Sequence, residues 1–144
     1  MLIKNIHHIG YLVKDIEKSA LNFENLGYIR ENLTFDPIQK ADILFMNLNG
    51  IKIELVAPQK NSQIYPLLKN YRDSPYHICY VVENINSAIY ELQILGYMMF
   101  REPVEAVAIS ANAKVAFLMK RNVGMIELVE LSIWRKNCIV LNIH

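Results

Sequence analysis

The 144-residue sequence predicts an α+β fold made of two tandem βαβββ modules, and an internal repeat is the main observation behind this prediction. Residues 8–28 and 77–97 align without a gap, and eight of the 21 pairs are identical. Each repeat then ends with the same tetrapeptide, Ile-Glu-Leu-Val, at 53–56 and 126–129. Because both copies carry the same order of hydrophobic patterns, we expect the same order of strands and helices in each.

The first module is expected over about residues 5–58. Residues 7–13 alternate and are rich in Ile, Tyr, Leu and Val, which is typical of a strand. Asp15 offers an N-cap oxygen to a helix, and Gly27 stands where a helix C-terminus favours positive φ. The apolar face of this helix is Ile16, Ala20, Phe23 and Leu26. Three further strands are expected near 28–34, 41–48 and 51–57, with Asn49-Gly50 as a hairpin turn.

The second module, about residues 74–131, repeats this order. Asn84 takes the place of the N-cap and Gly96 that of the C-terminal glycine. The expected later strands are near 97–102, 114–119 and 123–131. A polar linker, 59–73, should hold a short helix, and 102–113 is expected to be a loop. Residues 1–131 are expected to form a single domain, followed by a C-terminal tail, 132–144, that could pack on the domain or on a second subunit.

Composition excludes several classes of partner. A net charge of +1 and a pI near 7.8 favour neither nucleic acid nor an anionic membrane. No segment approaches the roughly 20 apolar residues of a membrane span, and the N-terminus does not resemble a secretory signal. The two cysteines, Cys79 and Cys138, have no metal-site spacing and are expected to be buried thiols. We therefore expect a cytoplasmic protein.

Four polar residues stand within apolar, strand-like runs. His8 and His77 are repeat equivalents, and so are Glu54 and Glu127. An isolated buried carboxylate costs several kcal/mol, so two of them at equivalent positions require a cation or protonation. Two neutral imidazoles and two carboxylates balance one divalent ion, and mixed nitrogen and oxygen ligands suit nickel, cobalt, zinc or manganese. His7, which has no repeat equivalent, is expected to point to the opposite strand face.

The ordered set of segments resembles the vicinal oxygen chelate (VOC) superfamily, which includes glyoxalase I, methylmalonyl-CoA epimerase and ring-cleaving dioxygenases. The segments begin at His8, Ile53, Tyr76, Lys114 and Ile126, and the resemblance covers residues 5–131. It implies the glyoxalase/bleomycin resistance fold, in which two βαβββ modules form a curved, cup-like, eight-stranded mixed sheet around a divalent nickel, cobalt or zinc ion. The family's ligand positions fall on His8, Glu54, His77 and Glu127.

The resemblance implies proton transfer at a carbon next to a carbonyl group, through an enediolate stabilised by the metal. Glu127 is the expected base, and Glu54 is a second carboxylate or only a ligand. The substrate would be a small thioester or hemithioacetal, and a homodimer is possible. A glyoxalase I (lactoylglutathione lyase) is the main expectation. A methylmalonyl-CoA epimerase is the alternative, although residues 32–53 contain no Glu and only Asp36 and Asp42 as acids. A non-catalytic binding or resistance protein is the third.

The sequence does not assign the substrate-binding residues. The basic candidates for holding a substrate such as glutathione are Arg30, Lys52, Arg101 and Lys120.

Overall fold

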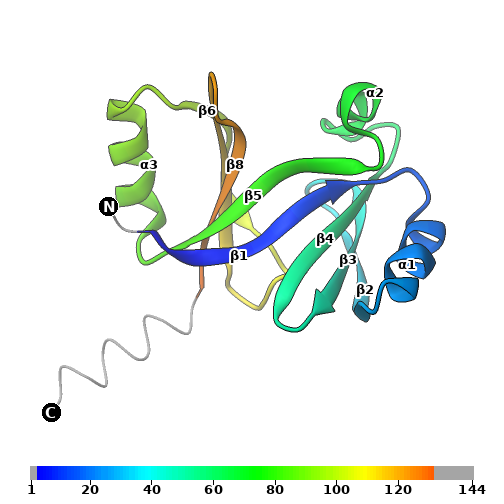
Figure 1. The fold of residues 1–144 in the computed structure, drawn as a ribbon. Coiled ribbons are helices and arrows are strands. Elements are labelled where there is room, and N and C mark those ends of the chain that lie inside the picture. Colours follow the sequence, from blue (N-terminus) through cyan, green and yellow to red (C-terminus); the bar gives the residue numbers. More distant parts are fainter. Residues whose placement is uncertain (1–2, 132–144) are drawn as a thin grey trace, which may run out of the picture. The chain divides into compact units, whose positions relative to one another are not determined.

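The computed structural model describes residues 3–131, and its elements alternate as the repeat predicts (Figure 1). The tail 132–144, with Cys138, lies outside the described residues. The elements of the first half are β1 (Ile3–Leu12), α1 (Ile16–Asn25), β2 (Ile29–Asp36), β3 (Ala41–Leu48) and β4 (Ile51–Pro58). A 3-10 turn, η1 (Tyr65–Leu67), and α2 (Leu68–Tyr71) follow. The second half contains β5 (Ser74–Val82), α3 (Ile85–Ile94), β6 (Met98–Glu105), β7 (Lys114–Lys120) and β8 (Gly124–Glu130).

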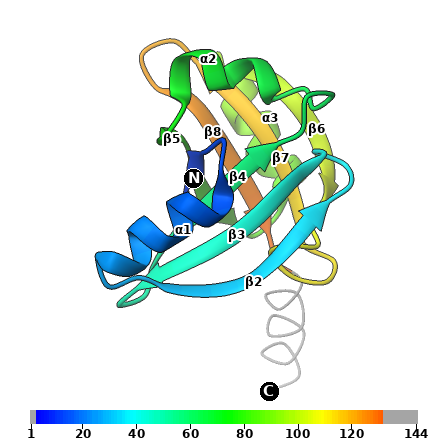
Figure 2. The same ribbon diagram turned by 90° about the vertical axis from the view of Figure 1, so that its right-hand side faces the viewer.

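The predicted α+β fold with repeated βαβββ modules is confirmed. The eight strands belong to one mixed sheet in the order β2-β3-β4-β1-β5-β8-β7-β6. Strand β1 pairs in parallel with β4, and β5 pairs in parallel with β8. The pairs β2–β3 and β3–β4 are antiparallel, as are β6–β7 and β7–β8. Figure 2 shows β2 and β3 running side by side.

The local signals in the sequence account for both long helices. Asp15 accepts a hydrogen bond from the Lys18 amide at the start of α1, and Asn84 accepts one from the Ser87 amide at the start of α3. Gly27 and Gly96 follow the two helices with φ of 106° and 95°, a conformation that only glycine adopts at little cost.

Two boundaries differ clearly from the prediction. Strand β1 begins at Ile3, whereas the sequence pattern predicts a start at residue 7. The loop expected from residue 102 begins later, because β6 continues to Glu105 and includes Pro103. A proline is tolerated there because β6 is an edge strand, and its pairing with β7 has two irregularities.

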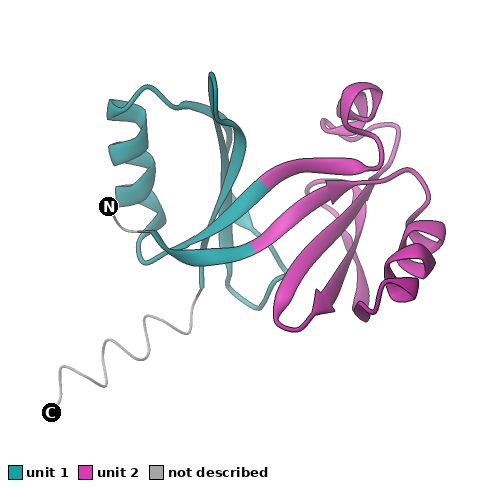
Figure 3. Ribbon diagram, viewed as in Figure 1, with its two compact units in different colours: residues 1–7, 78–144 teal, residues 8–77 magenta. Residues whose placement is uncertain are grey.

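The described chain separates into two compact units, whose boundaries fall inside β1 and β5 (Figure 3). One unit is residues 8–77. The other consists of 3–7 and 78–131 of the described residues. No helix within 3–131 has the length and apolar character needed to cross a membrane.

In the unit 8–77, α1 packs against β3 and β4 through one apolar cluster. Its buried members are Val13, Ala20, Leu44, Met46, Ile53 and Leu55. Since side chains alternate along a strand, the residues between these members point to the other face of the sheet.

In the second unit, α3 packs against β6, β7 and β8 in the same way, with Ala116, Leu118, Ile126 and Leu128 buried on the helix side. A separate cluster fills the opposite face of these strands. Its buried members are Cys79, Val81, Ala106, Ala113, Val115 and Val129.

Candidate metal centre

Strand alternation places Glu54 on the sheet face that α1 leaves uncovered. Its neighbours Ile53 and Leu55 both pack in the α1 cluster, so Glu54 points away from the helix. Glu54 pairs with Gly10 on β1 and with Phe45 on β3. His8 lies two residues before Gly10 and therefore shares this face.

Three of the four predicted ligands come together within the unit 8–77. The Nε2 atoms of His8 and His77 are 3.2 Å apart. Glu54 Oε1 lies 3.4 Å from the first nitrogen and 3.7 Å from the second. All three residues are buried: His8 is 1% exposed, Glu54 4% and His77 3%. Bulk water therefore does not compete for these donor atoms.

This triangle has the dimensions of adjacent positions around one metal ion. With metal–ligand bonds of about 2.0–2.2 Å, neighbouring donor atoms stand roughly 3.0–3.5 Å apart. The observed separations of 3.2, 3.4 and 3.7 Å need only small shifts to reach that geometry. The residues therefore fit a divalent ion.

Neighbouring residues fix the two imidazoles in place. The ring of His8 meets Phe45 edge to face, with centroids 5.2 Å apart. The ring of His77 lies directly over Gly10, where a Cβ atom would overlap it. Gly10 is thus required by the close approach of an imidazole, which the sequence did not indicate.

Glu127 occupies the equivalent position in the other unit. It is 1% exposed and stands between Cys79 on β5 and Phe117 on β7, as Glu54 stands between Gly10 and Phe45. The four predicted residues are all buried, and as a set they provide two imidazoles and two carboxylates, a donor set suited to a divalent metal ion.

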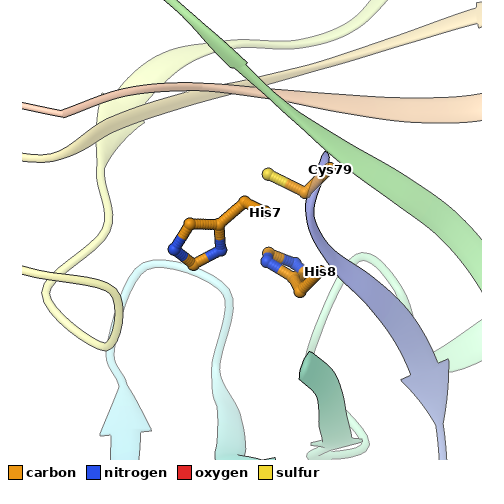
Figure 4. Close-up of side chains that lie close together, drawn as sticks. All are labelled: His7, His8 and Cys79. Carbon is orange, nitrogen blue, oxygen red and sulfur yellow. The ribbon is translucent and has the colours of Figure 1, made fainter. Parts of the chain in front are cut away.

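His7 does not behave as expected. A ring nitrogen of His7 lies within 4.8 Å of the Cys79 sulfur, and Figure 4 shows the two side chains with His8. Cys79 shares the sheet face of Glu127, with which it pairs. The approach of the His7 ring to Cys79 therefore differs from the expectation that His7 points away from this face.

Neither of the two acids in residues 32–53 is placed as Glu54 is. The Asp36 carboxylate is 2% exposed and accepts hydrogen bonds from the amides of Ile38 and Gln39 and from the Gln39 side chain. Asp42 pairs with Ala57 on β4, and both residues line an open cavity of about 830 Å³ beside α1. This cavity is on the helix side of the sheet, whereas Glu54 points to the other side.

Arg30, Lys52 and Lys120 each contact an acidic side chain or a carbonyl oxygen nearby. Arg30 donates hydrogen bonds to the carboxylates of Glu24 and Glu17, and these bonds, the one to Glu24 foremost, raise the pKa of its guanidinium above the usual value. The amino group of Lys52 is 3.4 Å from Glu31. The Lys120 amino group donates to the Leu95 carbonyl oxygen. The fourth candidate, Arg101 on β6, pairs with Phe117 and lies on the sheet face of Glu127.

Comparison with known proteins identifies the family of this chain. Residues 7–130 match the family described as Glyoxalase/Bleomycin resistance protein/Dioxygenase superfamily, and the chain belongs to it. The resemblance to the VOC superfamily is thereby confirmed.

Two relatives of the chain indicate which type of enzyme within the superfamily it is. The chain is 34% identical to the human protein "Methylmalonyl-CoA epimerase, mitochondrial" over 88% of its own length and 72% of the relative. It is 33% identical to an "Ethylmalonyl-CoA/methylmalonyl-CoA epimerase" of Cereibacter sphaeroides, over 66% of this chain and 73% of that one. The chain is thus an epimerase-type enzyme of the superfamily, which favours the alternative expectation over glyoxalase I.

Solved structures show the same fold. A Streptomyces coelicolor methylmalonyl-CoA epimerase variant in complex with 2-nitronate-propionyl-CoA superposes with a TM-score of 0.78. Its sequence identity is 17%, and the match covers 90% of this chain and 96% of that one. At this identity the likeness supports the fold alone.

Proposed function

We propose that this protein is a divalent-metal-dependent epimerase of a 2-substituted malonyl-CoA thioester, with methylmalonyl-CoA as the substrate to test first. The observation that carries the proposal is the buried triangle of His8, Glu54 and His77, whose donor atoms are 3.2–3.7 Å apart. The identity to epimerases, over most of the chain, supports the choice of reaction. The CoA thioesters in the names of these relatives support the choice of substrate class.

Glu127 is the proposed fourth ligand. It is the repeat equivalent of Glu54, it is buried, and it pairs with a phenylalanine on the neighbouring strand as Glu54 does. Two imidazoles and two carboxylates neutralise a nickel, cobalt or zinc ion and leave positions open for substrate oxygens. When bound, the ion would polarise the thioester carbonyl as a Lewis acid and so acidify the adjacent C–H bond.

The proton at C2 is moved by the two glutamates in this proposal. Epimerisation requires removal of a proton from one face of C2 and its return to the other face. Asp36 is held by three hydrogen bonds in the β2–β3 turn, and Asp42 faces the α1 side of the sheet. Glu54 and Glu127 are therefore assigned as the carboxylates that exchange the proton, in addition to their role as ligands.

The test is proton exchange by the metal-loaded protein. Wild-type protein with nickel, cobalt or zinc should wash the C2 proton of methylmalonyl-CoA into deuterated water. Glu127→Gln and Glu54→Gln should each lower that rate by about 100-fold or more, which is typical of a lost acid–base group. Glu31→Gln is the matched control, because Glu31 makes an exposed ion pair with Lys52 that contributes little.

Other outcomes would contradict the proposal. Formation of S-lactoylglutathione without C2 exchange would support the glyoxalase I alternative. Ligand binding with neither product would support a non-catalytic binding protein. Full metal occupancy after His8→Ala would remove His8 from the ligand set.

A further inference from the structure

In the second unit, one row of side chains crosses three strands, from Glu127, the proposed metal ligand, to the guanidinium of Arg101. Glu127 on β8 pairs with Phe117 on β7, and Phe117 pairs with Arg101 on β6. Directly paired residues of antiparallel strands point to the same face of the sheet. Glu127 and Arg101 therefore share a face, two strands or about 10 Å apart.

A bulge in β6 is what turns Arg101 to this face. Met99 pairs with Leu118, and both pack on the α3 side. In a regular strand Arg101 would share the face of Met99, two residues away. One register shift between Met99 and Arg101 inserts an extra residue and reverses the side on which Arg101 lies. A second shift follows before Val104, which belongs to the cluster on the Glu127 side.

Arg101 lies on a sheet face that is mostly apolar. The Glu127 face of β7 and β8 carries Val115, Phe117, Met119, Met125 and Val129 in addition to Glu127. These five are apolar, so Glu127 is the one charged side chain among the six on this face of β7 and β8. Arg101 is half-buried, and its Nη1 atom is fully buried. A guanidinium held beside apolar strands loses much of its hydration and interacts more strongly with an anion than a solvated lysine does.

From this arrangement we infer that Arg101 binds the carboxylate of the substrate and so selects acyl groups that carry a free acid. The inference rests on the proposed function, because it takes the reacting carbon to lie beside Glu127. In a 2-substituted malonyl thioester, the carboxylate is attached directly to that carbon. A guanidinium can hold a carboxylate with two parallel hydrogen bonds, which fixes orientation as well as charge. Arg101 is thus a specificity-determining residue and takes no part in proton transfer.

The test compares binding of two thioesters that differ by one charge. Isobutyryl-CoA replaces the carboxylate of methylmalonyl-CoA by a methyl group. Metal-loaded wild-type protein should bind methylmalonyl-CoA more tightly in calorimetric titrations. Arg101→Gln should reduce that preference by about 10- to 100-fold while the affinity for isobutyryl-CoA changes less than about twofold. Arg101→Lys, which keeps the charge without the fork, should lose an intermediate amount.

Controls separate this role from a structural one. Arg121→Gln removes an exposed arginine in the β7–β8 turn and should leave the preference unchanged. Thermal unfolding and metal content of each variant show whether the fold and the metal site are intact. If Arg101→Gln does not fold, Arg101→Lys carries the test. An unchanged preference in the folded Arg101 variants, or no preference in the wild type, overturns the inference.

Failure of the proposed function has a different signature. Wild-type protein would then neither exchange the C2 proton nor bind either thioester. In that case the probes are methylmalonate and isobutyrate, added to the metal-loaded protein and followed by NMR. A preference for methylmalonate that Arg101→Gln abolishes would support a carboxylate site at Arg101 without the CoA reaction. Equal binding of the two acids by wild type, or a preference that survives the substitution, would overturn it.

Discussion

Replacing Gly10 by Ala should displace the His77 imidazole and weaken metal binding by about two orders of magnitude. A Cβ atom at position 10 would overlap Cε1, Nδ1 and Nε2 of the His77 ring. Non-bonded carbon atoms are most favourably placed at about 3.5–4.0 Å, so the ring must retreat by more than about 1 Å. A shift of that size is incompatible with a coordination bond of about 2.0–2.1 Å.

The magnitude follows from the loss of one imidazole among the ligands. Disturbing even the outer partners of a metal site costs 10- to 100-fold in affinity, so displacing a ligand should cost at least about 100-fold, or about 2.8 kcal/mol. The assay is competition for zinc or nickel against a chromophoric chelator. It should be accompanied by thermal unfolding of the apo and loaded protein, since tighter binding gives the larger stabilisation.

Gly50→Ala is the matched control. Gly50 has a φ of 88°, so alanine there strains the backbone, but nothing lies within 4 Å of the added Cβ atom. This variant should lose stability while metal affinity stays at the wild-type value. If Gly10→Ala bound metal as tightly as wild type, the placement of His77 over Gly10, or its role as a ligand, would be refuted.

Two further predictions test the surroundings of the site. Asp36→Ala removes the acceptor of three hydrogen bonds in the β2–β3 turn and should lower the free energy of unfolding by about 1–3 kcal/mol in denaturant titrations. The folded variant should still exchange the C2 proton, and loss of exchange at unchanged stability would show that Asp36 is a base. Phe45→Leu removes the edge-to-face contact with the His8 ring and should cost about 1–2 kcal/mol of stability, with less than tenfold loss of metal affinity. Wild-type stability in that variant would mean that the ring does not support His8.

The amino-acid sequence by itself determined the order of elements and the composition of the candidate site. The repeat required no tertiary information, because identical residues at 8 and 77 and at 54 and 127 are visible in the chain. Local chemistry also fixed the helix starts at Asp15 and Asn84, since an N-cap depends only on atoms a few residues away. These are short-range properties, which a pattern along the chain can carry.

Tertiary structure alone decided the features that depend on contacts between distant segments. Gly10 is one, because the imidazole that excludes a side chain there comes from a residue 67 positions later. Arg101 is another, because a bulge of a single residue determines which face of β6 it occupies, and strand alternation read from the sequence would place it on the α3 side. The position of His7 near Cys79 is a third such feature, because the two residues are far apart in the sequence. A periodic pattern assumes regular strands, whereas bulges and close approaches arise from packing against chain that is far away in the sequence.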